Sequence, residues 1–135
     1  MLAIVTLLFL FGLNPVSGYK TFHVYAKATV VCNNPEAEIL AALYEQDFWN
    51  DDLVKEKTFT PANGKEISIY YDAYPSDGDP ESEVELYFWF RHSCRKHYIC
   101  KEGTAVLAAE DGDTVNFGRI ELGKDLMASC EYVGP

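Results

Sequence analysis

The stretch that decides the fold is Glu83-Val84-Glu85-Leu86-Tyr87-Phe88-Trp89-Phe90-Arg91. Its side chains alternate with a period of two, which is the period of a β-strand. One face of this strand is apolar and carries Val84, Leu86, Phe88 and Phe90. The opposite face mixes charged and aromatic side chains, among them Tyr87, Trp89 and Arg91. We expect the apolar face to pack in the core, and the mixed face to be partly covered or to form a contact surface.

Seven further segments have strand-like patterns, and turn residues separate them. Clear breaks are Asn33-Asn34-Pro35, residues 75–80 and Asp111-Gly112-Asp113. At most one short helix is expected, because no strong helical stripe occurs. Even residues 50–55, which open with capping residues, run out after about one turn. Eight short strands in a chain of this length are typical of a β-sandwich of two antiparallel sheets. The expected strands are residues 24–32, 38–44, 57–60, 66–71, 83–91, 97–101, 104–109 and 114–122.

Residues 1–18 have the pattern of a secretory signal peptide. Residues 1–13 are apolar and uncharged, and small residues follow at Val16-Ser17-Gly18. The apolar stretch is shorter than the roughly 20 residues that a membrane-spanning helix needs. The sequence therefore predicts a leader over residues 1–18, a single mature domain over residues 19–135, and an extracellular location.

Four cysteines lie in the predicted mature chain, at Cys32, Cys94, Cys100 and Cys130. In an exported chain, four cysteines indicate two disulfides. A zinc site is the weaker interpretation, because the sequence has no Cys-x-x-Cys pair. Cys94 and Cys100 flank a short turn, so that a chain reversal would bring them within disulfide distance. That pairing leaves Cys32 for Cys130.

The formal net charge of −10 argues against nucleic acid or an anionic membrane as a partner, because long-range repulsion would oppose both. Basic residues do gather locally, and a solvated strand end and loop is the simpler interpretation of this cluster. It consists of Arg91, His92, Arg95, Lys96, His97 and Lys101.

The sequence shows no pattern that indicates catalysis or metal binding. There is no Gly-x-Ser-x-Gly nucleophile motif, and the sequence names no second positioned group beside His23 that general base catalysis would need. Asp77, Asp79 and Glu81 are spaced like the start of an EF-hand loop, but Phe88 stands where that loop needs a glutamate. We expect no catalytic residue, no metal ion and no cofactor.

The order of several motifs resembles the transthyretin-like family of secreted nematode proteins. The strand–Cys–Pro element, the turn with Asn-Gly, the His-x-Cys element, the last strand and the C-terminal cysteine all occur in the family's order, although Ala28 stands where the family has glycine. These motifs are Ala26 to Pro35, Thr60-Pro61-Ala62-Asn63-Gly64, Phe90-Arg91-His92-Ser93-Cys94 with Cys100, Phe117 to Leu122, and Cys130.

The resemblance implies a transthyretin-type sandwich, in which the first and last strands share a sheet. Such an arrangement would bring the tail that carries Cys130 back to Cys32. Related sandwiches include the 5-hydroxyisourate hydrolases, which end in Tyr-Arg-Gly-Ser. This chain ends in Glu131-Tyr132-Val133-Gly134-Pro135 and lacks that element.

These observations favour a secreted, disulfide-stabilised binding or signalling module without catalysis. Its expected partner is an extracellular protein, a lipid or a small apolar ligand, and the candidate contact residues are Trp49, Tyr87, Trp89 and Arg91. One alternative is an oligomeric small-ligand carrier like transthyretin, with its pocket between subunits. A less favoured alternative is an enzyme of the hydroxyisourate hydrolase type.

The leader makes a direct prediction about export. N-terminal sequencing of secreted material should begin at Tyr19 or at a residue close to it, because the peptidase would cut after Gly18. Protein retained in the cytosol with Met1 intact would contradict the extracellular assignment.

Overall fold

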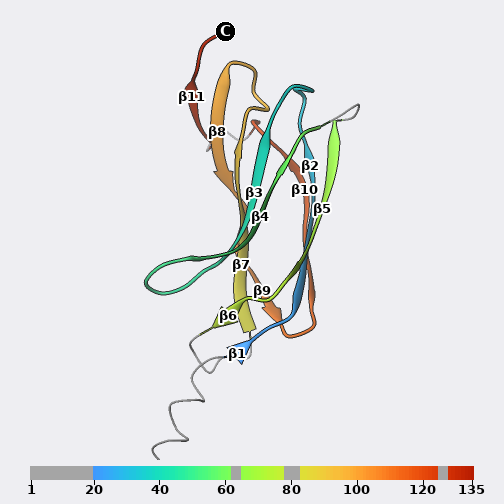
Figure 1. Cartoon of the computed structure of the whole chain (residues 1–135), viewed down its shortest axis with the longest axis vertical. Coiled ribbons are helices and arrows are strands. Elements are labelled where there is room, and N and C mark those ends of the chain that lie inside the picture. The colour runs from blue at the N-terminus through green and yellow to red at the C-terminus, as the bar shows by residue number, and fades with distance from the viewer. Residues whose placement is uncertain (1–19, 62–64, 78–82, 125–127) are drawn as a thin grey trace, which may run out of the picture.

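The computed structural model describes residues 20–61, 65–77, 83–124 and 128–135, and these form a β-sandwich (Figure 1). A three-stranded sheet in the order β10-β2-β5 lies against a six-stranded sheet in the order β11-β8-β7-β3-β4, in which β9 also pairs with β7. Strands β1 and β6 form a separate two-stranded sheet. The expected all-β sandwich is therefore confirmed. The predicted leader and the Asn63-Gly64 turn lie outside the described residues.

The strand bounds agree closely with the sequence pattern. All eight expected segments overlap a strand. The strands are β1 Lys20–Thr21, β2 Val24–Val31, β3 Ile39–Glu45, β4 Asp52–Phe59, β5 Glu66–Ala73, β6 Ser76–Asp77, β7 Glu83–His92, β8 Tyr98–Gly103, β9 Leu107–Glu110, β10 Thr114–Glu121 and β11 Ser129–Tyr132.

At most one short helix was expected, and the described residues contain none. Residues 50–55 lead into a strand instead. Strand β4 starts at Asp52 and pairs antiparallel with β3, because pairing satisfies its backbone groups where a single helical turn would not. Strand β11 lies in a tail for which no strand was expected. In the described parts of the chain there is no helix, and so none long enough to cross a membrane.

The core lies between the two sheets, and β7 supplies four of its fully buried side chains. Val84, Leu86, Phe88 and Phe90 are all fully buried, as their alternation predicts. The opposite sheet contributes Tyr71, whose hydroxyl donates a hydrogen bond to the Ala41 carbonyl oxygen in β3 at 2.6 Å. Burial raises the pKa of Tyr71 to about 12. This hydrogen bond ties β5 to β3 across the sandwich.

The disulfides differ from the expected pairing. Cys32 bonds to Cys94, and Cys100 bonds to Cys130. The predicted pairing was wrong because β11 pairs with β8 and places Cys130 directly opposite Cys100. The first and last expected strands, β2 and β10, do share a sheet, but the tail after β10 crosses to the other one. Cys32 follows β2 and Cys94 follows β7, so their bridge joins the two sheets.

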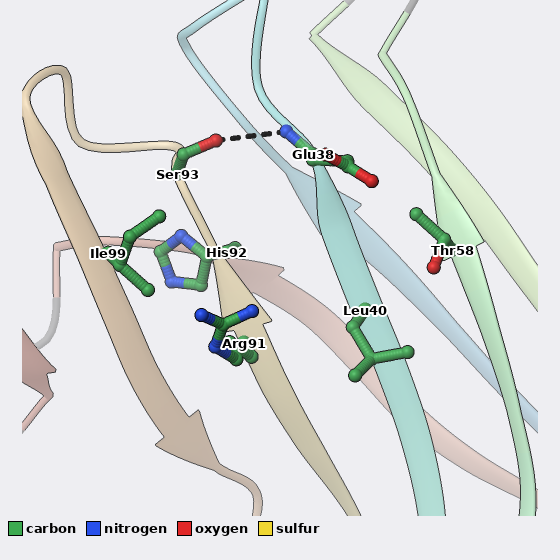
Figure 2. A pocket seen from close by; sticks show the side chains of 7 residues that line it. All are labelled: Glu38, Leu40, Thr58, Arg91, His92, Ser93 and Ile99. Atoms are coloured by element: carbon green, nitrogen blue, oxygen red, sulfur yellow. Dashed lines mark hydrogen bonds between the residues drawn. The ribbon is translucent and has the colours of Figure 1, made fainter.

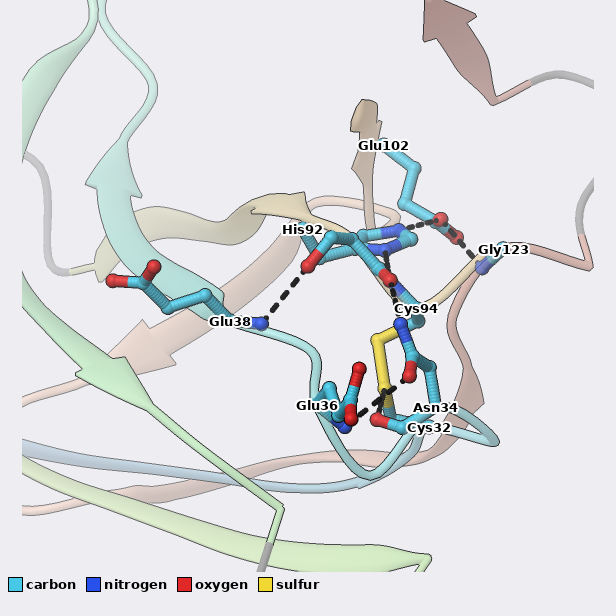
Figure 3. Close-up of a disulfide and its surroundings, with 9 residues drawn as sticks. Cys32, Asn34, Glu36, Glu38, His92, Cys94, Glu102 and Gly123 are labelled. Carbon is cyan, nitrogen blue, oxygen red and sulfur yellow. Dashed lines mark hydrogen bonds and ion pairs between the residues drawn. A yellow bond between two sulfur atoms is a disulfide. The ribbon is translucent and has the colours of Figure 1, made fainter. Parts of the chain in front are cut away.

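A buried polar contact lies beside this inter-sheet disulfide (Figure 3). His92 Nε2 and Glu102 Oε2 are 2.6 Å apart, and the two side chains are 1% and 8% exposed. The Cys94 N–H donates to His92 Nδ1 at 3.0 Å, so Nε2 carries the proton and donates to the carboxylate. The same Glu102 oxygen accepts the Gly123 N–H at 2.9 Å. Every buried side-chain nitrogen and oxygen atom of this contact thus has a hydrogen-bond partner.

Further hydrogen bonds attach the loop after β2 to the end of β7. Asn34 Nδ2 donates to the Ser93 carbonyl oxygen at 2.8 Å, and Ser93 Oγ accepts the Glu38 N–H at 3.0 Å. The Ser93 N–H in turn donates to the Glu38 carbonyl oxygen. We use the name junction for the Cys32–Cys94 disulfide, His92, Glu102 and these loop contacts. It holds the ends of β2, β3, β7 and β8 and the segment after β10 together.

Removing the disulfides pairwise should show which one matters more for stability. The bridges span sequence separations of 62 and 30 residues, for which chain entropy gives about 4 and about 3.5 kcal/mol. The C32A/C94A variant also releases one sheet from the other. Its free energy of unfolding in guanidinium should therefore fall further than that of C100A/C130A. An equal loss, or the reverse order, would contradict the role assigned to the junction.

Candidate contact surface

Three of the four candidate contact residues lie side by side on the outer face of the six-stranded sheet. Tyr87, Trp89 and Arg91 alternate along β7, opposite to the side chains that fill the core. The antiparallel register extends each of them into a row across neighbouring strands. The rows are Tyr87 with Tyr44, Trp89 with Ala42 and Gly103, and Arg91 with Leu40 and Lys101.

Trp89 lies at the centre of this face and is 40% exposed. Its indole ring covers Gly103 in β8: a Cβ atom at Gly103 would lie 2.9 Å from Trp89 Cε3, which is too close. The residue opposite on the other side is Ala42. Small neighbours on both strands therefore make room for the indole, and about two fifths of the residue's surface remains available for contact.

Arg91 stands at one end of the face, between Leu40 of β3 and Ile99 of β8 (Figure 2). Two grooves adjoin it, of about 200 and 210 Å³. Arg91 lies directly opposite Lys101, although like charges in this arrangement repel each other. Among the described residues, neither cation forms an ion pair.

The fourth candidate, Trp49, lies in the loop between β3 and β4 together with Phe48. Their side chains are 83% and 84% exposed, and the two rings meet edge to face with centroids 4.9 Å apart. The loop projects from the six-stranded sheet on the side away from the three-stranded sheet (Figure 1). We call residues 46–51 the aromatic loop. It stands on the same side of the molecule as Trp89.

Tyr87 holds the aromatic loop against the sheet. Its hydroxyl donates a hydrogen bond to Asp51 Oδ2, while Asp51 Oδ1 accepts the Asp47 N–H at 3.1 Å. The Tyr87 ring also stacks on Tyr44, with centroids 5.6 Å apart. Burial, and then the hydrogen bond to Asp51, raise the pKa of Tyr87 above its ordinary value. Asp51 thus links the two ends of the aromatic loop through the Asp47 N–H and attaches the loop to β7 through Tyr87.

Charges are distributed unevenly along this face. The end near the aromatic loop carries acidic residues, namely Asp47, Asp51 and Glu85. The opposite end carries the row of Arg91 and Lys101. The face is therefore acidic and aromatic at one end. The other end carries the Arg91–Lys101 row, with Glu38 and Glu131 in the adjoining grooves, and Trp89 lies between the two ends.

The rest of the basic cluster in the sequence is spread over separate positions. The Arg95 guanidinium lies over the Tyr98 ring, 4.4 Å from its centroid. His97 has a positive φ of 73° and its Nδ1 lies 3.2 Å from the Gly134 carbonyl oxygen. His92 is buried in the junction. Only Arg91 and Lys101 therefore form a shared row on the outer face.

Between residues that the structure describes, two histidine–carboxylate contacts occur, and neither belongs to this face. His92 and Glu102 are closed to solvent and stabilise the junction. His23 Nε2 lies 2.6 Å from Asp72 Oδ1, and its ring stacks on Tyr74 with centroids 4.4 Å apart. Within the described ranges, no three His, Cys, Asp or Glu side chains gather closely enough to hold a metal ion. Asp79 and Glu81 lie outside those ranges.

No family model, curated protein or solved structure matches the chain. The resemblance to the transthyretin-like family therefore stays a prediction from the sequence motifs. The contact surface must be judged on its own geometry.

The role of Tyr87 can be tested by removing its hydroxyl. Tyr87→Phe should speed hydrogen exchange of the Asp47 amide roughly fivefold, which corresponds to about 1 kcal/mol for one lost hydrogen bond. Tyr44→Phe is the matched control. It removes the hydroxyl from the other ring of the same stack and leaves the hydrogen bond to Asp51 in place. Unchanged exchange at Asp47 in Tyr87→Phe would show that the loop is held by other contacts.

Proposed function

We propose that this chain is a secreted, non-catalytic binding module that engages another extracellular protein through the outer face of its six-stranded sheet. The observation that carries this proposal is the exposed Phe48–Trp49 pair on an aromatic loop that Tyr87 and Asp51 hold in place. Two disulfides stabilise the domain, as is typical of proteins that fold in an oxidising compartment. The predicted leader supports the same location.

The aromatic residues support a protein partner on energetic grounds. Tryptophan, tyrosine and arginine dominate the binding energy of protein interfaces, and the face presents Trp49, Trp89, Tyr87 and Arg91 together. A loop that is already ordered loses little conformational entropy on binding. The aromatic loop is thus already ordered before a partner binds.

The chemistry of the face favours protein over the other expected ligands. The grooves beside Arg91 are lined by charged side chains, including Glu38 in one and Lys101 and Glu131 in the other. A lipid or small apolar ligand needs a predominantly apolar pocket. Asp47 and Asp51 beside the exposed rings would also be repelled by an anionic membrane.

The test is to remove the exposed rings and compare protein capture. Immobilised wild-type protein, the F48S/W49S variant and a control, Tyr70→Ser, would be exposed to extracellular fluid from the organism that makes the chain. Tyr70 is 59% exposed but lies on β5, in the other sheet. Loss of hot-spot residues typically costs 2 kcal/mol or more, so F48S/W49S should retain at least about tenfold less partner.

The control separates a specific surface from general stickiness. Tyr70→Ser should bind as the wild type does. A partner that F48S/W49S retains fully, or that Tyr70→Ser loses, would show that the aromatic loop is not the binding site.

A further inference from the structure

The charge pattern of the outer face is complementary to itself. Acidic residues lie at the aromatic-loop end, and Arg91 and Lys101 lie at the other. If a second copy faces the first with its strands reversed, the acidic end of each copy meets the basic end of the other. A two-fold axis produces this reversal and closes the assembly at two copies.

The two positive charges at the basic end form no ion pair with any described carboxylate. Arg91 and Lys101 repel each other across β7 and β8, and no described carboxylate pairs with either. Glu38 and Glu131 line the adjoining grooves without reaching ion-pair distance. An incoming acidic group would relieve the repulsion between the two cations, and the aromatic loop carries such a group at Asp47.

The dimensions of the face agree with this arrangement. Tyr87 and Arg91 are four residues apart on one strand, which is about 13 Å at the rise of a β-strand. Trp89 lies midway between them. A two-fold axis that passes beside Trp89 would therefore bring the two indoles together and place each aromatic loop over the basic row of the other copy.

We propose that the protein bound by this face is a second copy of the same chain, in a two-fold dimer that pairs each aromatic loop with the partner's Arg91–Lys101 row. This inference rests on the proposed function and names its partner. Aromatic side chains at the centre supply the apolar contact, and the charges at the two ends set the orientation. Since each copy carries a formal charge of −10, net repulsion opposes association and makes the dimer depend on protein concentration.

The experiment is a reciprocal charge exchange on the intact, disulfide-bonded protein. D47K/N50K makes the aromatic loop basic, and R91E/K101E makes the basic row acidic. All four positions are exposed, so both variants should fold, which an unchanged melting temperature would verify. Mass in solution would be measured by sedimentation velocity between about 1 and 100 μM.

The expected results follow from the two-fold geometry. Wild-type protein should form dimers. Each variant alone should be monomeric over the whole range, because it brings like charges together at both contacts. An equimolar mixture should form dimers that contain one copy of each variant, which native mass spectrometry identifies, because opposite charges then meet at both contacts.

Three results would overturn this inference. They are a monomeric wild type at 100 μM, dimers that persist in both variants, and a mixture that stays monomeric. If the wild type is monomeric while F48S/W49S still loses a different captured protein, the proposed binding function stands and only the identity of the partner is wrong. If neither self-association nor capture depends on Phe48 and Trp49, the binding function itself fails.

Discussion

The buried contact between His92 and Glu102 is the constraint on which the rest of the structure depends. Both side chains are polar and almost fully enclosed, so each requires its partner: a buried polar group left alone costs about 1–3 kcal/mol, and more when it is charged. His92 lies at the end of β7, Glu102 lies in β8, and Gly123 binds the same carboxylate from the segment after β10. One contact therefore fixes three segments of the chain, and the Cys32–Cys94 bridge adds β2.

The contact surface is a consequence of that constraint. The pairing of β7 with β8 places Trp89 over Gly103 and Arg91 opposite Lys101. A shift of one residue would turn every side chain of β7 to the other face and bury the charged row. Since the junction sets this register at the ends of the strands, the side chains on the outer face keep fixed neighbours. At the other end of the face, the hydrogen bond between Tyr87 and Asp51 holds the aromatic loop.

Local pattern was enough to predict the sandwich, and it failed where long-range pairing decides. The alternation in residues 83–91 predicted the core side chains of β7 because burial of one strand face follows directly from period two. The disulfide pairing depends on which strand the C-terminal tail joins. Ser129–Tyr132 is short and largely exposed, so it carries little of the apolar alternation that reveals a strand. The candidate residues Trp49, Tyr87, Trp89 and Arg91 were recognisable by type, but the hydrogen bond from Tyr87 to a loop 36 residues away was not.

The central claim is that the outer face of the six-stranded sheet binds a second copy of the same chain. Hydroxyl-radical footprinting of the wild-type protein tests it most directly, with oxidation measured residue by residue in dilute and in concentrated solution. The account predicts that oxidation of Phe48, Trp49 and Trp89 falls on concentration, while Tyr70, which is 59% exposed on the other sheet, stays equally reactive. Protection of Tyr70 without protection of the tryptophans, or no protection at all, would contradict it.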